Sequence, residues 1–554
     1  MTDQNPVVQL CEFNLWIRKG SSRIQVLKNL SLSIHAGERW GIAGESGAGK
    51  SMTMYSLLSL LPEKSTEVSG KILYRSRDGS MEELLQIPYK KRHAYCANHA
   101  AVILQDSINA LNPFERIEKQ WIPTVRLHHP EMEESTIRAH LLERMERFGI
   151  AGGEEVLRKY PHQLSGGMKQ RIAIAMALES NAGILIADEP TTSLDTVNQR
   201  KIISFIDEIC RTEHLTLLYI SHNLGIVQHL CTHAAILKDG EITGQGKLED
   251  VFFRTESGYT AQLIRETEKL YSSAGRQKDF NSADKSGQEE LLRVENVTKT
   301  FPKMAGGFRK STFTAAEKIS FSVHKGEIIG LLGESGCGKS TLAKVITGLI
   351  PPTSGNVFFR DTIISGLDSH AYRPFRRSVQ MIFQNPFDSL DPRMKVRNIL
   401  LEPLRLWKIG KTKEEREKTI LQMCRDCGLS EASLEKYPTE FSGGQLQRIA
   451  IARALLVRPE FLIADEIVSA LDVSVQNQIL ELLLQMKEKY GLTILFITHD
   501  LAVIRRISDR VMVMQGGHLL ACGRTEEVLD QPEQPYIRSL TDAAFFLRRP
   551  AGTN

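Results

Sequence analysis

Two short glycine-rich segments have the spacing that binds phosphate. Residues 44–51 read Gly-Glu-Ser-Gly-Ala-Gly-Lys-Ser, and residues 333–340 read Gly-Glu-Ser-Gly-Cys-Gly-Lys-Ser. In such a loop, successive backbone N–H groups point at a phosphate, and the helix that follows adds its positive N-terminus. The lysine then reaches the β- and γ-phosphates, and the serine binds Mg²⁺. The predicted phosphate-loop residues are Gly44, Glu45, Ser46, Gly47, Ala48, Gly49, Lys50, Ser51 and Met52, then Gly333, Glu334, Ser335, Gly336, Cys337, Gly338, Lys339, Ser340 and Thr341.

An Asp-Glu pair follows each phosphate loop at the end of an apolar run. These pairs are Asp188-Glu189 and Asp465-Glu466. The position predicts two carboxylates at the sheet edge where ligands bind. Each aspartate then suits a Mg²⁺-linked role, and each glutamate suits polarisation of an attacking water. A lone acidic pair at a strand end is more often a helix cap, but two copies downstream of phosphate loops favour the catalytic interpretation.

The two sets of motifs belong to a tandem duplication. Lys50 recurs as Lys339, Asp188-Glu189 as Asp465-Glu466, and Ile220-Ser-His222 as Ile497-Thr-His499. Fixed-period self-similarity of this kind indicates repeated domains. Residues 271–288 are polar and serine-rich, which is typical of a flexible linker. We therefore expect one domain over residues 1–270 and a second over residues 289–554.

Each motif is placed by an expected strand. Apolar runs at residues 39–43 and 328–332 enter the phosphate loops, and runs at residues 216–220 and 493–497 lead to the histidines. Apolar strands that alternate with helices predict a mostly parallel α/β core in each half.

The bulk composition excludes several other classes of protein. The chain has 554 residues, 42% hydrophobic residues and a net charge of only +4, which does not favour nucleic acid as a ligand. We expect no secretory signal at the start and no membrane span in this chain. Among eight cysteines, only Cys424 and Cys427 have ligand-like spacing, and buried structural thiols are the favoured interpretation over a redox or metal pair.

The order of motifs resembles that of the ABC ATPases over nearly the whole chain. A Ser-Gly-Gly signature lies between the phosphate loop and the Asp-Glu pair in each half, followed by Arg-Ile-Ala-Ile-Ala. The resemblance implies ATP and Mg²⁺ as ligands, and a P-loop NTPase fold with a mostly parallel core sheet, an antiparallel β subdomain and a helical subdomain. It also implies that the domains dimerise within one chain, with each signature completing the opposite ATP site. The signature residues are Ser165, Gly166, Gly167, Ser442, Gly443 and Gly444.

The same resemblance assigns further residues around the two ATP sites. Gln105 and Gln384 match the glutamine that contacts Mg²⁺ or water, His222 and His499 match the γ-phosphate histidine, and Phe301 matches the adenine-stacking aromatic. The implied Mg²⁺ set is Ser51, Gln105, Asp188, Ser340, Gln384 and Asp465.

The two copies also differ at several positions around the ATP sites. Lys19 stands where the second half has Phe301, with Trp16 the nearest aromatic, Met52 replaces Thr341, and Met168 replaces Gln445. We therefore expect two hydrolytic sites of unequal affinity, the Lys50 site being the weaker. Cys337 lies inside a phosphate loop, and we expect alkylation there to inhibit and ATP to protect; the alternative is a small filling residue.

Within the ABC ATPases, the sequence resembles the peptide/nickel importer branch. The runs after Gln105 and Gln384 and the C-terminal segments of both halves carry this resemblance. It implies two integral-membrane permease subunits as partners, an extracytoplasmic solute-binding protein as an indirect partner, and a peripheral position on the cytoplasmic face of the membrane. The resemblance favours peptides as the transported solute, and nickel, metal chelates and glutathione are the less favoured alternatives. A ribosome-acting twin-ABC factor is the alternative, and a DNA-repair ATPase a more distant one.

Overall fold

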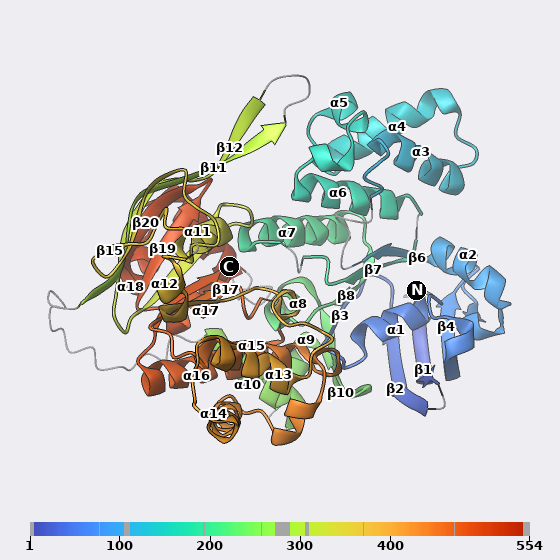
Figure 1. Cartoon of the computed structure of the whole chain (residues 1–554). Helices are drawn as coiled ribbons and strands as arrows, with labels where there is room; N and C mark the ends of the chain where they lie inside the picture. The colour runs from blue at the N-terminus through green and yellow to red at the C-terminus, as the bar shows by residue number, and fades with distance from the viewer. Residues whose placement is uncertain are drawn as a thin grey trace. The chain divides into compact units, whose positions relative to one another are not determined.

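The computed structural model describes residues 5–20, 22–76, 78–104, 111–180, 182–191, 194–255, 258–271, 289–304, 310–368, 370–469 and 471–546. The chain divides into two compact units, the first formed mainly by residues up to Arg265 and the second by residues from Glu266 to Ala544. Most of the expected linker, residues 272–288, lies outside the described residues. Each unit is described by itself (Figure 1).

A six-stranded sheet forms the core of the first unit, in the order β10-β9-β3-β8-β7-β6. All neighbouring strands pair in parallel except β10 with β9. Every residue of β7 and β8 is buried, because helices cover both faces of the sheet. The strands are β3 (Arg39–Gly44), β6 (Ala100–Ile103), β7 (Ile184–Asp188), β8 (Thr216–Ile220), β9 (His233–Lys238) and β10 (Glu241–Lys247).

The second unit repeats this sheet with the same connectivity, in the order β20-β19-β13-β18-β17-β16. Only β19 and β20 pair antiparallel. The strands are β13 (Ile328–Gly333), β16 (Val379–Ile382), β17 (Phe461–Asp465), β18 (Thr493–Thr498), β19 (Arg510–Gln515) and β20 (His518–Arg524). The mostly parallel core expected from the apolar runs is confirmed in both units.

An antiparallel four-stranded sheet lies beside each core sheet, as the family resemblance implied. The first has the order β2-β1-β4-β5 and the second β12-β11-β14-β15. Their strands are β1 (Val8–Lys19), β2 (Ser22–Ile34), β4 (Thr66–Arg75) and β5 (Met81–Glu83), then β11 (Glu290–Met304), β12 (Lys310–His324), β14 (Ser354–Phe359) and β15 (Thr362–Ile363).

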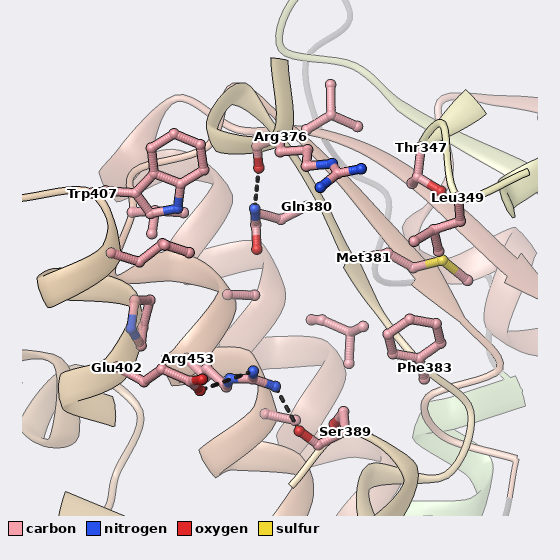
Figure 2. Close-up of a pocket in the computed structure, with 17 residues that line it drawn as sticks. Thr347, Leu349, Arg376, Gln380, Met381, Phe383, Ser389, Glu402, Trp407 and Arg453 are labelled. Atoms are coloured by element: carbon pink, nitrogen blue, oxygen red, sulfur yellow. Dashed lines mark hydrogen bonds and ion pairs between the residues drawn. The ribbon is translucent and has the colours of Figure 1, made fainter. Parts of the chain in front are cut away.

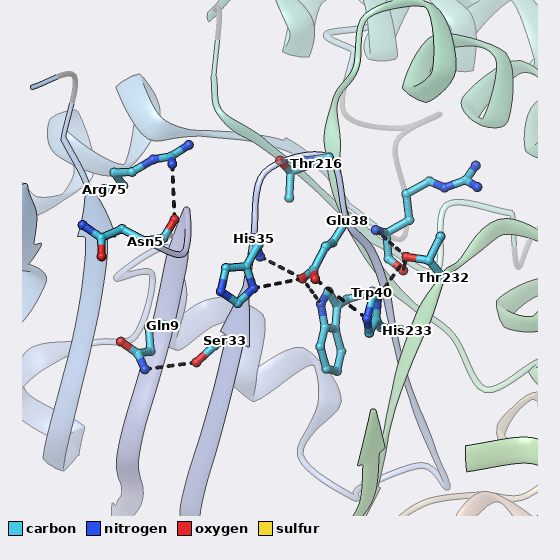
Figure 3. Close-up of polar contacts among 12 residues, drawn as sticks. Asn5, Gln9, Ser33, His35, Glu38, Trp40, Arg75, Thr216, Thr232 and His233 are labelled. Atoms are coloured by element: carbon cyan, nitrogen blue, oxygen red, sulfur yellow. Dashed lines mark hydrogen bonds and ion pairs between the residues drawn. The ribbon is translucent and has the colours of Figure 1, made fainter. Parts of the chain in front are cut away.

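A glutamate fixes the turn between the antiparallel sheet and the core sheet in the first unit (Figure 3). Glu38 Oε2 accepts a hydrogen bond from the backbone N–H of His35 at 2.8 Å and another from Trp40 Nε1 at 2.8 Å. The Trp40 ring stacks on His233 at 4.9 Å between centroids. Burial raises the pKa of Glu38, but these hydrogen bonds and the nearby imidazoles outweigh it and hold the pKa below its usual value.

A group of helices forms a separate subdomain in each unit (Figure 1, teal in the first and orange in the second). In the first unit these are α3 (Ile117–His128), α4 (Glu134–Arg147), α5 (Gly153–Leu157) and α6 (Gly166–Ala177), with the short 3-10 helix η4 (Leu178–Ser180) after α6. In the second they are α13 (Val396–Leu406), α14 (Lys413–Asp426) and α15 (Gly443–Leu455).

The remaining helices flank the core sheets or close each unit. In the first unit they are α1 (Lys50–Leu57), α2 (Tyr89–His99), α7 (Thr196–Thr212), α8 (Leu224–Leu230), α9 (Leu248–Phe253) and α10 (Gly258–Tyr271). In the second they are α11 (Lys339–Ile346), α12 (Arg373–Ser378), α16 (Val473–Tyr490), α17 (Leu501–Ile507), α18 (Thr525–Asp530) and α19 (Pro535–Phe546). Within the described ranges, none of these helices is both long enough and apolar enough to cross a membrane.

Candidate active sites

Each glycine-rich segment forms a loop between a buried strand and a helix, as expected. The loop of the second unit joins β13 to α11, and Gly338 caps that helix with a φ of 107°. A Cβ on Gly338 would meet the carbonyl oxygen of Ala315 at 1.9 Å, so only glycine fits there. Gly49 occupies the same left-handed position before α1, with a φ of 104°.

The lysine of each loop is held by the loop itself. Lys50 Nζ donates hydrogen bonds to the carbonyl oxygens of Gly44 and Glu45, at 2.8 and 3.0 Å. Lys339 Nζ makes the matching bonds to Gly333 and Glu334, both at 2.8 Å. Both ammonium groups are therefore buried, with hydrogen-bond partners in their own loops.

The serine and aspartate assigned to Mg²⁺ lie together in each unit. Ser340 Oγ donates a hydrogen bond to Asp465 Oδ1 at 3.2 Å, and the Ser51 hydroxyl bonds Asp188 in the same way. Burial raises the pKa of both aspartates, assisted by the neighbouring glutamate charge. A hydroxyl and a buried carboxylate are oxygen donors that suit Mg²⁺, and a cation there relieves the cost of burying the charge.

The glutamates after these aspartates have an unusual backbone. Glu189 and Glu466 have positive φ values of 44° and 50°, a region that L-residues other than asparagine and aspartate seldom adopt. Their N–H groups donate to Ile220 and Ile497 across the sheet, each at 2.9 Å, and these bonds hold the conformation. Such strain turns each side chain away from the strand line at the carboxyl edge of the sheet.

The histidines contact these glutamates within each unit. His222 Nδ1 lies 2.9 Å from Glu189 Oε1, and His499 Nδ1 lies 3.6 Å from Glu466 Oε2. Gln384 Nε2 donates to the same Glu466 oxygen at 2.9 Å. Burial raises the pKa of Glu466, but His499 and Lys339 outweigh it, so the pKa lies below its usual value. Burial lowers the pKa of His499, yet its bond to Glu466 reverses this and raises it.

The signature serines cap the helices that follow them. Ser165 is the N-cap of α6 and its Oγ accepts from Met168 N at 3.3 Å. Ser442 is the N-cap of α15, and its backbone N–H donates to Gln445 Oε1 at 3.1 Å. Gly166 and Gly443 are the first residues of the two helices. The backbone N–H groups of each first turn are therefore flanked by residues without large side chains.

Some assigned residues are not placed together with these groups. Gln105 lies outside the described residues. Phe301 lies on β11, 37% exposed, with Lys299 Nζ 5.2 Å from its ring centroid. In the first unit the Arg23 guanidinium covers the Trp16 ring at 4.2 Å. An aromatic ring thus lies near the start of each unit with a cation beside it, and the cation is closer to the ring in the first unit.

The cysteines follow the structural interpretation. Cys337 is buried at 7% exposure and burial raises its pKa, which favours the filling-residue alternative over a reactive thiol. Cys424 and Cys427 are fully buried in the second helical subdomain, where burial raises their pKa values to about 11 and about 12. Neither has the exposure of a redox or metal pair.

One residue at the second phosphate loop was not found from the sequence. The Tyr536 hydroxyl, at the start of α19, accepts a hydrogen bond from the backbone N–H of Glu334 at 3.2 Å. The C-terminal segment therefore braces the phosphate loop, a contact between residues far apart in the chain.

A pocket of about 330 Å³ lies in the second unit between the core and the helical subdomain (Figure 2). Phe383, next to Gln384, lies on the core side, and Leu406 and Trp407 lie on the helical side. Arg453 crosses the floor, donating to the Ser389 carbonyl at 2.6 Å and contacting Glu402 at 3.4 Å. The pocket walls therefore combine apolar side chains with the polar side chains of Arg376 and Gln380, and the Arg453–Glu402 pair lies at one end.

This fold and these sites define a pair of P-loop ATPase domains. The ABC transporter family model matches residues 27–192 and 316–469, and the chain belongs to this family as an ABC-type ATPase. It is 36% identical to "Glutathione import ATP-binding protein GsiA" of Pectobacterium atrosepticum, over 98% of this chain and 90% of that protein. The protein of the same name from Escherichia coli O157:H7 gives the same figures. Among solved structures, the ATP-binding cassette MJ0796, described as a dimer bound to ADP and Pi, matches with 30% identity and a TM-score of 0.39, covering 42% of this chain and 99% of that one. The resemblance to the ABC ATPases is thus confirmed.

Proposed function

We propose that this chain is the ATP-hydrolysing subunit of a membrane importer, with both nucleotide sites in one polypeptide. The observation that carries the proposal is the presence, in each unit, of a phosphate loop, a Ser–Asp pair, a strained glutamate and a histidine on that glutamate. Two permease subunits in the membrane are the partners, and an extracytoplasmic binding protein delivers the solute. The ribosomal and DNA-repair alternatives receive no support from the relatives.

The relatives' names guide the choice of solute. Because they are glutathione import proteins aligned over 98% of this chain, we place glutathione beside short peptides as the leading cargo. The chain then works at the cytoplasmic face of the membrane as a peripheral subunit. We keep the domain boundaries at residues 1–270 and 289–554, with residues 271–288 as the linker.

Hydrolysis follows from the groups already described. When ATP enters, Lys50 and Lys339 exchange the loop carbonyls for β- and γ-phosphate oxygens, and the loop N–H groups bind the same phosphates. Ser51 with Asp188, and Ser340 with Asp465, would hold Mg²⁺, which would supply positive charge against the phosphate oxygens.

The attacking water is oriented by the strained glutamates. Glu189 and Glu466 accept a hydrogen bond from it, so the water oxygen faces the γ-phosphorus. His222 and His499 hold these carboxylates now and reach the γ-phosphate in the bound state. The signature serines of one unit, Ser165 or Ser442, complete the site of the other by their helix N-termini.

The pocket beside Gln384 is the surface on which the membrane partner would dock. A short cytoplasmic helix of a permease would lay apolar side chains against Leu406 and Trp407 and an acidic group near Arg453. Gln384 donates a hydrogen bond to Glu466, so a movement of the pocket wall would displace the carboxylate that orients water.

Glutamate variants test the proposal. In the intact transporter, the Glu189→Gln/Glu466→Gln double variant should lower ATP turnover by about 10²-fold or more, because neither amide can accept the water proton, and each single variant should remove the turnover of its own site. ATP should still bind, which filter binding or calorimetry measures. If Glu189→Gln leaves turnover unchanged, the first site is not hydrolytic; if both variants do, the chain is not the motor.

A further inference from the structure

A buried carboxylate in the first helical subdomain has partners that the ATPase function does not use. Glu179 lies in η4, directly after α6, and its side chain is 0% exposed. Its Oε1 accepts a hydrogen bond from Trp121 Nε1 at 2.9 Å and another from Arg144 Nε at 3.3 Å. Its Oε2 faces two imidazoles instead, with His140 Nε2 at 2.9 Å and His129 Nε2 at 3.6 Å.

The three groups come from three elements. His129 is the residue that ends α3, His140 lies within α4, and Glu179 is in η4. The two Nε2 atoms and a carboxylate oxygen all lie within 4.8 Å of one another. The imidazole side chains are about one-fifth exposed, whereas the carboxylate is buried.

The second unit shows that the fold does not need a polar cluster at this place. The helices α4 and α14 have equal length, and their first residues lie the same number of residues after the first residues of α3 and α13, so positions correspond directly. The counterparts of Trp121, Arg144 and Glu179 are Leu400, Met423 and Leu456, all buried among apolar side chains. The counterpart of His140 is Thr419. An apolar junction therefore suffices, and a buried charge there is costly unless it has a use.

We propose that His129, His140 and Glu179 form a binding site for a divalent transition-metal ion of the zinc type. Two imidazole nitrogens and one carboxylate oxygen are a donor set that zinc prefers, with a solvent molecule in the fourth position. Donors in a tetrahedral zinc site lie roughly 3.4 Å apart, between the 2.9 and 3.6 Å found here. Small shifts of the two rings admit the ion.

The neighbouring side chains fit the same purpose. Trp121 and Arg144 hold Oε1 and so turn Oε2 toward the imidazoles, which is how outer hydrogen bonds orient a metal-binding carboxylate. Arg144 also donates to the Leu178 carbonyl at 2.7 Å, which fixes the guanidinium. The ion would tie the end of α3 and the middle of α4 to η4, and so stiffen this subdomain.

Zinc titration of the intact, tag-free chain tests the site. Calorimetry with excess Mg²⁺ and ADP present, so that the phosphate sites are filled, should show one zinc per chain. His140→Gln and His129→Gln should each weaken zinc affinity by at least about tenfold. Gln at position 140 keeps an N–H donor for Glu179, so packing is preserved. His162→Gln, which makes the same change at an exposed histidine of this unit, is the matched control.

A second measurement separates binding from folding defects. Zinc should raise the Tm of the unaltered chain and of His162→Gln, and should not raise that of the two site variants. Cobalt should give the visible absorption of a four-coordinate ion in the unaltered chain and in His162→Gln, and not in the two site variants. Equal zinc affinity in all four proteins, or no zinc binding by the unaltered chain, would overturn the proposal and leave a hydrogen-bonded ion cluster.

Discussion

The two glutamates that we propose to orient water show why residue identity and backbone strain go together. Asparagine or aspartate would adopt the positive φ of Glu189 and Glu466 more easily. The longer side chain is kept because its carboxylate must extend from the sheet edge to the histidine and to the water. The strain is stabilised by the N–H bonds to Ile220 and Ile497, which belong to the strand beside the Asp-Glu strand.

The His499–Glu466 pair gives a pH-dependent prediction at the same scale. The pKa of His499 is raised in the folded chain, so its stabilisation is complete below the unfolded pKa of about 6.5 and is lost as pH rises through the folded value. Glu466, with its lowered pKa, stays ionised throughout this range. His499→Gln should therefore destabilise the second unit by on the order of 1 kcal/mol near pH 6 and by less near pH 9.

Thermal unfolding of the unaltered chain and the variant at the two pH values measures this difference. His370→Gln, at an exposed histidine of the same unit, is the control and should change Tm equally at both pH values. A loss of Tm in His499→Gln that is the same at both pH values would contradict a charged pair.

At the scale of elements, the two signature helices differ in how they begin. Gln445 accepts from the Ser442 N–H and closes a reciprocal cap, whereas Met168 at the same place in α6 cannot. Gln445→Met should destabilise the second unit by about 0.5–1 kcal/mol, because it removes the acceptor at the helix start. Denaturant unfolding measures the change.

The control for this cap keeps the acceptor but adds charge. Gln445→Glu should retain the stability of the second unit, since glutamate completes the same motif. It should nevertheless lower ATP turnover, because a carboxylate then stands at the helix end proposed to meet a phosphate. If Gln445→Met and Gln445→Glu lose equal stability, the side-chain cap is not what stabilises α15.

The strands that enter the phosphate loops and lead to the histidines could be predicted from the sequence to within one residue, but the contacts around them could not. The expected run at residues 216–220 is β8 itself, and the run at 493–497 falls one residue short of β18. Buried parallel strands are uninterrupted apolar runs, which is a local signal. The Tyr536 brace and the Glu179 cluster join residues far apart in the chain, and no local pattern marks them. The positive φ of Glu189 is also set by a neighbouring strand.

At the scale of the whole molecule, duplication has kept the catalytic groups and changed their surroundings. Lysine, serine, aspartate, glutamate and histidine recur with matching contacts in both units. The differences lie at the signature cap, at the adenine position and in the helical subdomain, where Glu179 replaces Leu456. Because both units belong to one polypeptide, every first unit is made together with its own second unit. The two units can therefore accumulate different substitutions and still remain paired.

This divergence predicts two classes of ATP site that can be told apart in one chain. Phe301 offers a partly exposed ring whose centroid lies 5.2 Å from Lys299 Nζ, whereas the Arg23 guanidinium lies closer to the Trp16 ring, at 4.2 Å. Stacking of a base on an aromatic is worth about 1–3 kcal/mol, so the Lys339 site should bind ATP more tightly than the Lys50 site.

In a Glu189→Gln/Glu466→Gln background that cannot hydrolyse, calorimetry should resolve a tight and a weak class. Lys339→Ala should remove the tight class and Lys50→Ala the weak one, and Phe301→Ala should bring the two affinities together. Equal residual affinity in the two lysine variants would show that the halves are equivalent in binding despite their different adenine positions.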